Sequence, residues 1–162
     1  MRIFEERQSF RQWWLFLILG VVILVISIQL FRKQAIFSEQ EKIMLIFFAL
    51  VPGILVSLLI FSMSLNTRID STGIKVKWKP LSFFKKQYSW NEISQVYVRT
   101  YAPIREYGGW GLRGFGVNKA WNVSGNSGIQ IKTKSGKKFL IGTREPEQAK
   151  QVLTRYSNNQ KS

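Results

Sequence analysis

A glycine-rich block near the middle of the chain has the spacing of a nucleotide-binding loop. Gly109-Trp110-Gly111-Leu112-Arg113-Gly114 matches the pattern G-x-G-x-x-G. A dinucleotide site of this kind needs a buried strand before the glycines and a helix after them. The preceding segment, residues 103–107 (PIREY), does not have the pattern of a buried strand, and residues 115–117 (FGV) do not start a helix. The block therefore predicts no nucleotide site.

The rest of the chain offers few of the side chains that enzymes use for catalysis. The sequence contains no His and no Cys, which removes imidazole bases, thiolate nucleophiles and the metal sites that these side chains build. The acids beyond residue 66 are Asp70, Glu92, Glu106, Glu145 and Glu147. They are spread along the segment, and no two carboxylates share an obvious cleft. We expect no enzyme, no catalytic residue, no metal site and no cofactor.

Binding is the better interpretation of the glycine-rich region. Its candidate recognition residues are Arg105, Tyr107, Trp110, Arg113 and Phe115. Tyr, Trp and Arg carry much of the binding energy at protein interfaces, and arginine beside aromatic rings also suits a phosphate or lipid headgroup. The alternative is a structural loop whose Trp110 and Phe115 cover one end of a domain.

Two uncharged apolar runs precede this region. They cover residues 13–31 and 43–65, which are 19 and 23 residues long. About 20 helical residues cross a hydrocarbon core of about 30 Å. The link between them, residues 32–42, carries five charges and belongs in water. Residues 13–65 therefore predict a transmembrane helical hairpin. The first run is too long for a signal-peptide core, and both runs are apolar on all sides, unlike most core helices.

Small residues predict where the two spans pack against each other. These residues are Gly20, Ala49, Gly53 and Ser57. Small side chains at helical spacing allow close approach of two backbones, within the hairpin or in a homo-oligomer. Residues 1–12 read as a charged amphipathic lead-in that lies at the membrane interface. Neither span contains an ionisable residue, which argues against a transporter or channel.

Charge asymmetry predicts the orientation. The chain carries a net charge of +15, and residues 66–162 hold 18 of the 24 Lys and Arg but 5 of the 9 Asp and Glu, a net charge of +13. Basic residues that flank membrane spans stay in the cytoplasm. We therefore expect both termini and the basic domain in the cytoplasm and the link outside.

The segment after the spans, residues 66–162, has a sequence pattern typical of strands and turns. Apolar Ile74, Val76 and Trp78 alternate with Lys75, Lys77 and Lys79. This period of two predicts a strand with an apolar inner face and a basic outer face. Ser135-Gly136 predicts a hairpin, and residues 146–156 predict an amphipathic helix. We expect one domain over residues 66–157 and a disordered tail over 158–162.

Two stretches carry a family resemblance. Trp90-Asn91-Glu92-Ile93 before a strand, and residues 137–146 (KKFLIGTREP) before the last helix, resemble bacterial pleckstrin-homology-like domains. Residues 106–113 and 122–126 resemble an uncharacterised family of bacterial membrane proteins. The resemblance implies an α+β protein, with the hairpin followed by a small PH-like β-barrel or bent sheet and a carboxy-terminal capping helix. It implies the bacterial cytoplasmic (inner) membrane and no known ligand residues.

These observations predict a membrane-anchored, non-enzymatic interaction or scaffold module that presents its basic domain at the cytoplasmic membrane face. Its partner would be a protein or a second copy of the chain. The alternative is a module that senses anionic lipid headgroups of the inner leaflet. Basic residues interleaved with aromatic ones also occur in nucleic-acid-binding proteins, but membrane attachment disfavours that interpretation.

Overall fold

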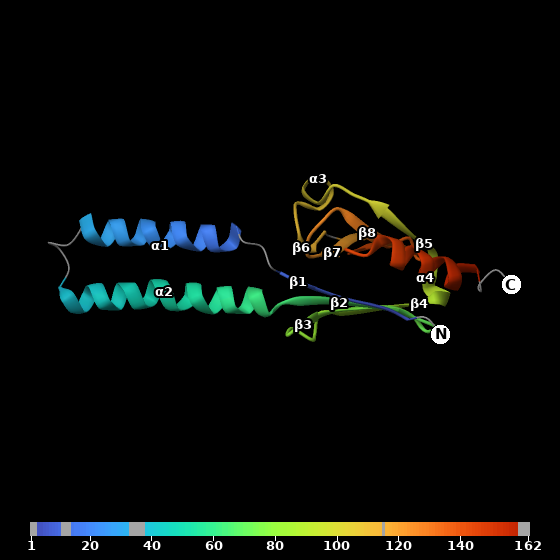
Figure 1. The fold of residues 1–162 in the computed structure, drawn as a ribbon, viewed down its shortest axis with the longest axis horizontal. Coiled ribbons are helices and arrows are strands. Elements are labelled where there is room, and N and C mark those ends of the chain that lie inside the picture. Colours follow the sequence, from blue (N-terminus) through green and yellow to red (C-terminus); the bar gives the residue numbers. More distant parts are fainter. Residues whose placement is uncertain (1–2, 11–13, 33–37, 115, 159–162) are drawn as a thin grey trace. The chain divides into compact units, whose positions relative to one another are not determined.

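The β-rich part of the protein is assembled from two separate stretches of chain. The computed structural model describes residues 3–10, 14–32, 38–114 and 116–158 (Figure 1). It divides into a helical unit, residues 11–62, and a β-rich unit formed by residues 1–10 and 63–162. The helical unit is thus inserted into the β-rich unit.

The helical unit consists of α1 (Trp14–Arg32) and α2 (Glu39–Ser62), which contact each other side by side (Figure 1). A capping box starts α2: the Ser38 hydroxyl accepts the Glu41 N–H at 3.3 Å, and the Glu41 carboxylate accepts the Ser38 N–H at 2.8 Å. By length and composition, α2 alone qualifies as a membrane span in the described part of the chain. The apolar stretch described in α1, Gly20–Gln29, is shorter than a span. The expected pair of spans is therefore not supported by this criterion.

Two expectations about the helices are corrected. Helix α2 ends at Ser62 rather than Leu65, because Leu65 belongs to a strand and is fully buried. Gly20 is exposed, and a Cβ atom at this position would meet no heavy atom within 4 Å. Gly20 therefore does not mark a close approach of α1 to α2 within one chain, and its role in packing between copies of the chain stays a prediction. Gly53 and Ser57 are half-buried and joined by a hydrogen bond of 2.8 Å, whereas the surroundings of the Ala49 side chain are outside the described part.

The amino-terminal segment is a strand of the β-rich unit and not an interfacial lead-in. β1 (Phe4–Ser9) pairs antiparallel with β2 (Ser64–Asp70) along its whole length. Its side chains alternate between the interior and solvent, with Phe4, Glu6 and Gln8 buried. The β domain therefore begins at the amino-terminus, and the expected boundary at residue 66 cuts through β2.

The first sheet has the order β1-β2-β3-β4, with β3 at Gly73–Lys79 and β4 at Lys85–Ser89. All neighbours in it are antiparallel. The predicted alternation in β3 is confirmed: Ile74, Val76 and Trp78 are buried, and the lysines between them lie on the opposite face. A glycine is required at position 73, because its φ is 142° and an added Cβ would overlap the Tyr88 carbonyl oxygen.

The second sheet has the order β5-β8-β9-β7-β6. Its strands are β5 (Ile93–Thr100), β6 (Gly111–Arg113), β7 (Asn118–Asn122), β8 (Ser127–Thr133) and β9 (Lys138–Gly142). The hairpin predicted around Ser135-Gly136 is confirmed as β8–β9. The β6–β7 hairpin was not expected, and β7 pairs parallel with β9. Two short elements join the strands: a 3-10 turn, η1 (Trp90–Glu92), and α3 (Pro103–Tyr107).

The core lies between the two sheets and the last helix, α4 (Pro146–Asn158), which contacts β1, β5 and β8. Ala149, Val152 and Leu153 of α4 are buried, as the amphipathic pattern predicts. The chain is thus an α+β protein with two sheets and a carboxy-terminal helix. Asn158 belongs to α4, and residues 159–162 of the expected tail lie outside the described residues.

Candidate functional site: a basic groove on the first sheet

The predicted recognition residues fall on α3, on β6 and on the turn between them. Arg105 and Arg113 are exposed, Tyr107 and Trp110 are half-buried, and Phe115 lies outside the described residues. The structure brings Arg113 and Trp110 together, because the Arg113 Nε donates a hydrogen bond of 2.8 Å to the Trp110 carbonyl oxygen. The region is therefore an ordered element and not an open loop.

Several polar side chains of this region hold α3 in place. Arg99 on β5 binds both carboxylate oxygens of Glu106, at 2.7 and 3.2 Å, and Glu106 also accepts the Ala102 N–H at 2.8 Å. The Arg99 guanidinium holds the pKa of Glu106 below its usual range. The Tyr107 ring packs edge-on against Tyr101, with the ring centroids 6.0 Å apart. These groups stabilise the region internally.

A buried asparagine, which sequence reasoning missed, fastens the β6–β7 hairpin. Asn122 is fully buried at the end of β7; it accepts the Gly111 N–H and donates to the Tyr101 hydroxyl, both at 2.8 Å. The Trp110 indole N–H donates to the Gly125 carbonyl oxygen at 3.0 Å. Asn122 is therefore a buried residue of the β6–β7 hairpin and not a surface residue. Of the described candidate residues, only the two arginines remain exposed for recognition.

A groove of about 790 Å³ lies on the outer face of the first sheet. Its basic lining residues are Arg7, Arg68, Lys75, Lys77, Lys79, Lys85 and Lys86, which come from all four strands of the sheet. Cross-strand register places Arg7 beside Asn66, Asn66 beside Lys77, and Lys77 beside Lys85. Side chains that are opposite each other on neighbouring strands lie about 5 Å apart at their Cβ atoms. One row across the groove therefore carries three cations.

The adjacent row is already neutralised by carboxylates. Arg68 forms ion pairs with Glu5 at 2.6 Å and with Asp70 at 3.0 Å, and Lys75 approaches Asp70 at 3.4 Å. The pKa of Asp70 is held well below its usual range, chiefly by the hydrogen bond from the Thr72 hydroxyl and further by Arg68 and Lys75. Asp70 therefore stays ionised, and this row contributes little net charge.

The remaining cations of the groove have no such partners. Within the described ranges, no carboxylate forms an ion pair with Arg7, Lys77, Lys79, Lys85 or Lys86. Guanidinium and ammonium groups that converge without counter-charges bind anions such as carboxylates and phosphates. The groove is therefore the strongest candidate site. The alternating lysines of β3 predicted its central strand, but the contribution of Arg7 depends on the pairing of β1.

The groove does not resemble a metal site. Its free lining groups are hydrogen-bond donors that carry positive charge, whereas a bound cation needs carboxylate, imidazole, thiolate or carbonyl ligands. In the part of the chain that the structure describes, no group of three or more His, Cys, Asp or Glu side chains gathers at one place.

No protein-family model matches this sequence, and no curated protein matches it either.

Proposed function

We propose that this chain is a membrane-anchored, non-enzymatic interaction module that presents a basic, PH-like domain at the cytoplasmic face of a bacterial inner membrane. In this proposal α1 and α2 form a transmembrane hairpin, and the domain binds an acidic segment of a partner protein through the basic groove. The observation that carries the proposal is the row of unpaired cations across the first sheet.

The apolar surface of the helical unit supports the anchor. Exposed side chains include Leu17, Val21, Leu24 and Ile28 on α1, and Leu45, Phe48, Leu55 and Leu59 on α2. Soluble monomers rarely expose contiguous apolar patches larger than a few hundred Å². Helix α1 contains 19 residues and, at about 1.5 Å per residue, is about 28 Å long, close to the thickness of a hydrocarbon core. These exposed apolar side chains are the observation that favours a bilayer as the environment of the two helices.

Strand pairing supports an even number of membrane crossings. β1 precedes α1, β2 follows α2, and the two strands pair with each other over six residue pairs. The chain must therefore leave and return on the same side of a membrane. If α2 crosses once, one further crossing is needed, and α1 is the helix available for it.

Cysteine accessibility tests this topology, and the chain contains no native Cys that would interfere. We expect Gln40→Cys, at the start of α2, to react with a membrane-impermeant maleimide from outside intact cells. Ser71→Cys, on the β2–β3 turn, should react only after the cells are opened; both residues are exposed. Labelling of both positions from the same side would contradict the hairpin.

A second candidate function is supported by the position of the groove in the chain. Lys79 pairs with Ser64, which follows the end of α2 by two residues. Each basic residue near an anionic leaflet contributes about 1 kcal/mol of attraction. The groove would then bind lipid headgroups, and the domain would sense the anionic lipid content of the leaflet.

Charge reversal in the groove separates specific binding from general basicity. We expect Lys77→Glu with Lys85→Glu, in full-length protein held in zwitterionic nanodiscs, to weaken binding of a labelled decaglutamate peptide by about tenfold or more, because two cation contacts are replaced by repulsion. The measurement is fluorescence anisotropy at two salt concentrations.

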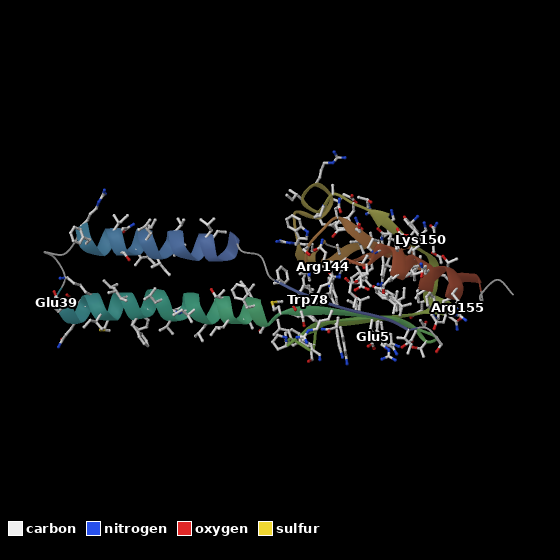
Figure 2. All side chains as sticks on the ribbon, viewed as in Figure 1. Glu5, Glu39, Trp78, Arg144, Lys150 and Arg155 are labelled. Carbon is white, nitrogen blue, oxygen red and sulfur yellow. The ribbon has the colours of Figure 1, made fainter. Side chains whose placement is uncertain are left out.

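The matched control carries the same change of net charge outside the groove. Lys134→Glu with Lys150→Glu alters the β8–β9 turn and α4, where Figure 2 shows Lys150. Equal weakening in both variants would show that the peptide responds to net charge alone, and the proposed groove would then be wrong. If anionic nanodiscs suppress peptide binding to both the wild type and the control, which share an intact groove, lipid occupies the groove and the second candidate is favoured.

A further inference from the structure

We propose that the loop between β3 and β4, residues 80–84, inserts the Phe83 ring into the headgroup layer of the bilayer that holds α2. This inference rests on the proposed membrane anchor and goes beyond it, because it gives the β domain a binding surface for lipid that is separate from the helices. The occupant is the interface of a bilayer that contains anionic lipids.

Chain connectivity keeps the loop close to the anchor. The loop begins after Lys79, which pairs with Ser64 across β3 and β2. Ser64 follows the last helical residue, Ser62, by two positions, so their Cα atoms are at most about 7 Å apart. Paired residues of antiparallel strands add about 5 Å. The base of the loop is thus held within about 12 Å of the end of α2, and the polar layer of a bilayer is about 5–7 Å thick on each side.

The loop is a turn held by backbone hydrogen bonds, and it exposes one aromatic ring. The Ser82 N–H donates to the Pro80 carbonyl oxygen at 2.8 Å, and the Phe84 N–H donates to the Leu81 carbonyl oxygen at 3.0 Å. A third hydrogen bond, from the Trp78 N–H to the Phe84 carbonyl oxygen at 2.9 Å, ties the turn to β3. The position of Phe83 is therefore set by backbone hydrogen bonds.

The two phenylalanines of the loop have different environments. Phe84 is half-buried and packs against the core, whereas Phe83 is 71% exposed. Their ring centroids are 4.4 Å apart, so the Phe83 ring packs against the ring of Phe84. Phenylalanine on a membrane-facing surface can bury its ring at the boundary between headgroups and acyl chains, which would give this exposed ring a role.

Basic residues flank the loop on both sides. Lys79 precedes it, Lys85 and Lys86 follow it, and none of them forms an ion pair among the described residues. Lysine side chains extend toward headgroup phosphates while their aliphatic stems lie along apolar surface. An apolar tip between cations is complementary to an anionic lipid interface, where the tip meets acyl chains and the flanks meet phosphates. A partner protein would not need the loop to lie next to the span.

Site-specific fluorescence tests the insertion, and the absence of native Cys allows single labelling positions. The full-length variants Ser82→Cys and Ser71→Cys are labelled with an environment-sensitive fluorophore and reconstituted into vesicles of phosphatidylcholine and phosphatidylglycerol. Ser82 lies beside Phe83, which is retained, and Ser71 lies on the turn at the far end of the β2–β3 pair. Seven strand residues place the two ends about 20 Å apart.

We expect the label at position 82 to emit at shorter wavelength and to be quenched about threefold more strongly by spin-labelled headgroup lipids than the label at position 71, because only the former would lie in the polar layer. Adding Phe83→Ser to the Ser82→Cys variant should remove most of the difference. The same difference with and without Phe83 would show that the fluorophore, and not the loop, causes insertion, and would overturn the inference.

The experiment distinguishes failure of the proposed membrane anchor from failure of the proposed loop insertion. Loss of the protein from floated vesicles after an alkaline wash would contradict the membrane anchor itself. Protein that stays with the vesicles while the labels at positions 82 and 71 behave alike would leave the anchor standing and overturn the loop insertion.

Discussion

A chain in which residues 11–62 are replaced by Asn-Gly, so that Phe10 joins Met63 through a two-residue turn, should fold as a water-soluble domain. Residues 66–162 alone should not fold. The first chain keeps β1 beside β2, whereas the second lacks β1 and the start of β2. Asn-Gly favours the type I′ turn that connects adjacent antiparallel strands, and the Phe10 N–H already donates to the Met63 carbonyl oxygen at 3.4 Å.

The expected loss in the shorter chain is large because core residues are removed. Phe4 and Leu65 are 3% and 0% exposed, and both belong to the core cluster. Removing a buried Phe or Leu costs about 2–5 kcal/mol each, and a domain is stable by only about 5–15 kcal/mol in total. The unpaired edge of the truncated β2 would also favour aggregation.

Near-ultraviolet circular dichroism and the dispersion of amide proton resonances measure the outcome. The joined chain should show a cooperative thermal transition, and the shorter chain should show none. A cooperative transition in residues 66–162 would contradict the assignment of β1 to the domain, because it would show that the domain does not need this strand.

Glu6→Ala should destabilise the joined soluble domain by about 3 kcal/mol, since it leaves a buried hydroxyl donor and a part-buried N–H donor without their acceptor. Glu6 is 7% exposed; it accepts the Thr143 hydroxyl at 2.6 Å and the Arg144 N–H at 2.8 Å. These bonds connect β1 to the junction of β9 and α4. The neighbouring Gln8 donates to the Gly142 carbonyl oxygen at 2.6 Å and adds a second connection.

Glu5→Ala is the matched control, because Glu5 lies next to Glu6 on the exposed face of the same strand. Its ion pair with Arg68 is exposed to solvent, and such pairs contribute little to stability. Chemical denaturation measures both variants. Equal losses for Glu5→Ala and Glu6→Ala would show that the buried hydrogen bonds of Glu6 are not what holds β1 to the second sheet.

The pH dependence of stability provides a further readout for Glu6. Burial raises the pKa of Glu6 above its usual value of 4.5, so the folded protein binds a proton at a pH where the unfolded chain has released it. This contribution to the free energy of unfolding is fully present below about pH 4.5 and is lost as the pH rises through the folded pKa. On going from pH 7 to pH 5, the wild type should therefore gain stability relative to Glu6→Gln. No change in the difference between the two proteins would contradict a raised pKa.

Local sequence pattern was sufficient to predict the elements whose defining residues lie close together in the chain. Period-two alternation predicted β3, turn residues predicted the β8–β9 hairpin, and the apolar stripe at helical spacing predicted α4. In each case the side chains that alternate or repeat are close in the chain, so their burial can be read from spacing alone. The charge of the β3 lysines likewise predicted the centre of the basic face.

Only the tertiary structure decided the role of β1, because its inward residues are not apolar. Glu6 and Gln8 are polar in the sequence and buried in the fold, where Thr143 and Arg144, between β9 and α4, donate to Glu6, and Gly142 of β9 accepts from the Gln8 amide. The same holds for Asn122, whose partners Tyr101 and Gly111 are distant in sequence. Sequence by itself therefore determined the apolar helices, the basic strand and the terminal helix. Arg7 lines the groove only because β1 pairs with β2. These two strands are separated in the chain by α1 and α2, so no local sequence pattern predicts their pairing.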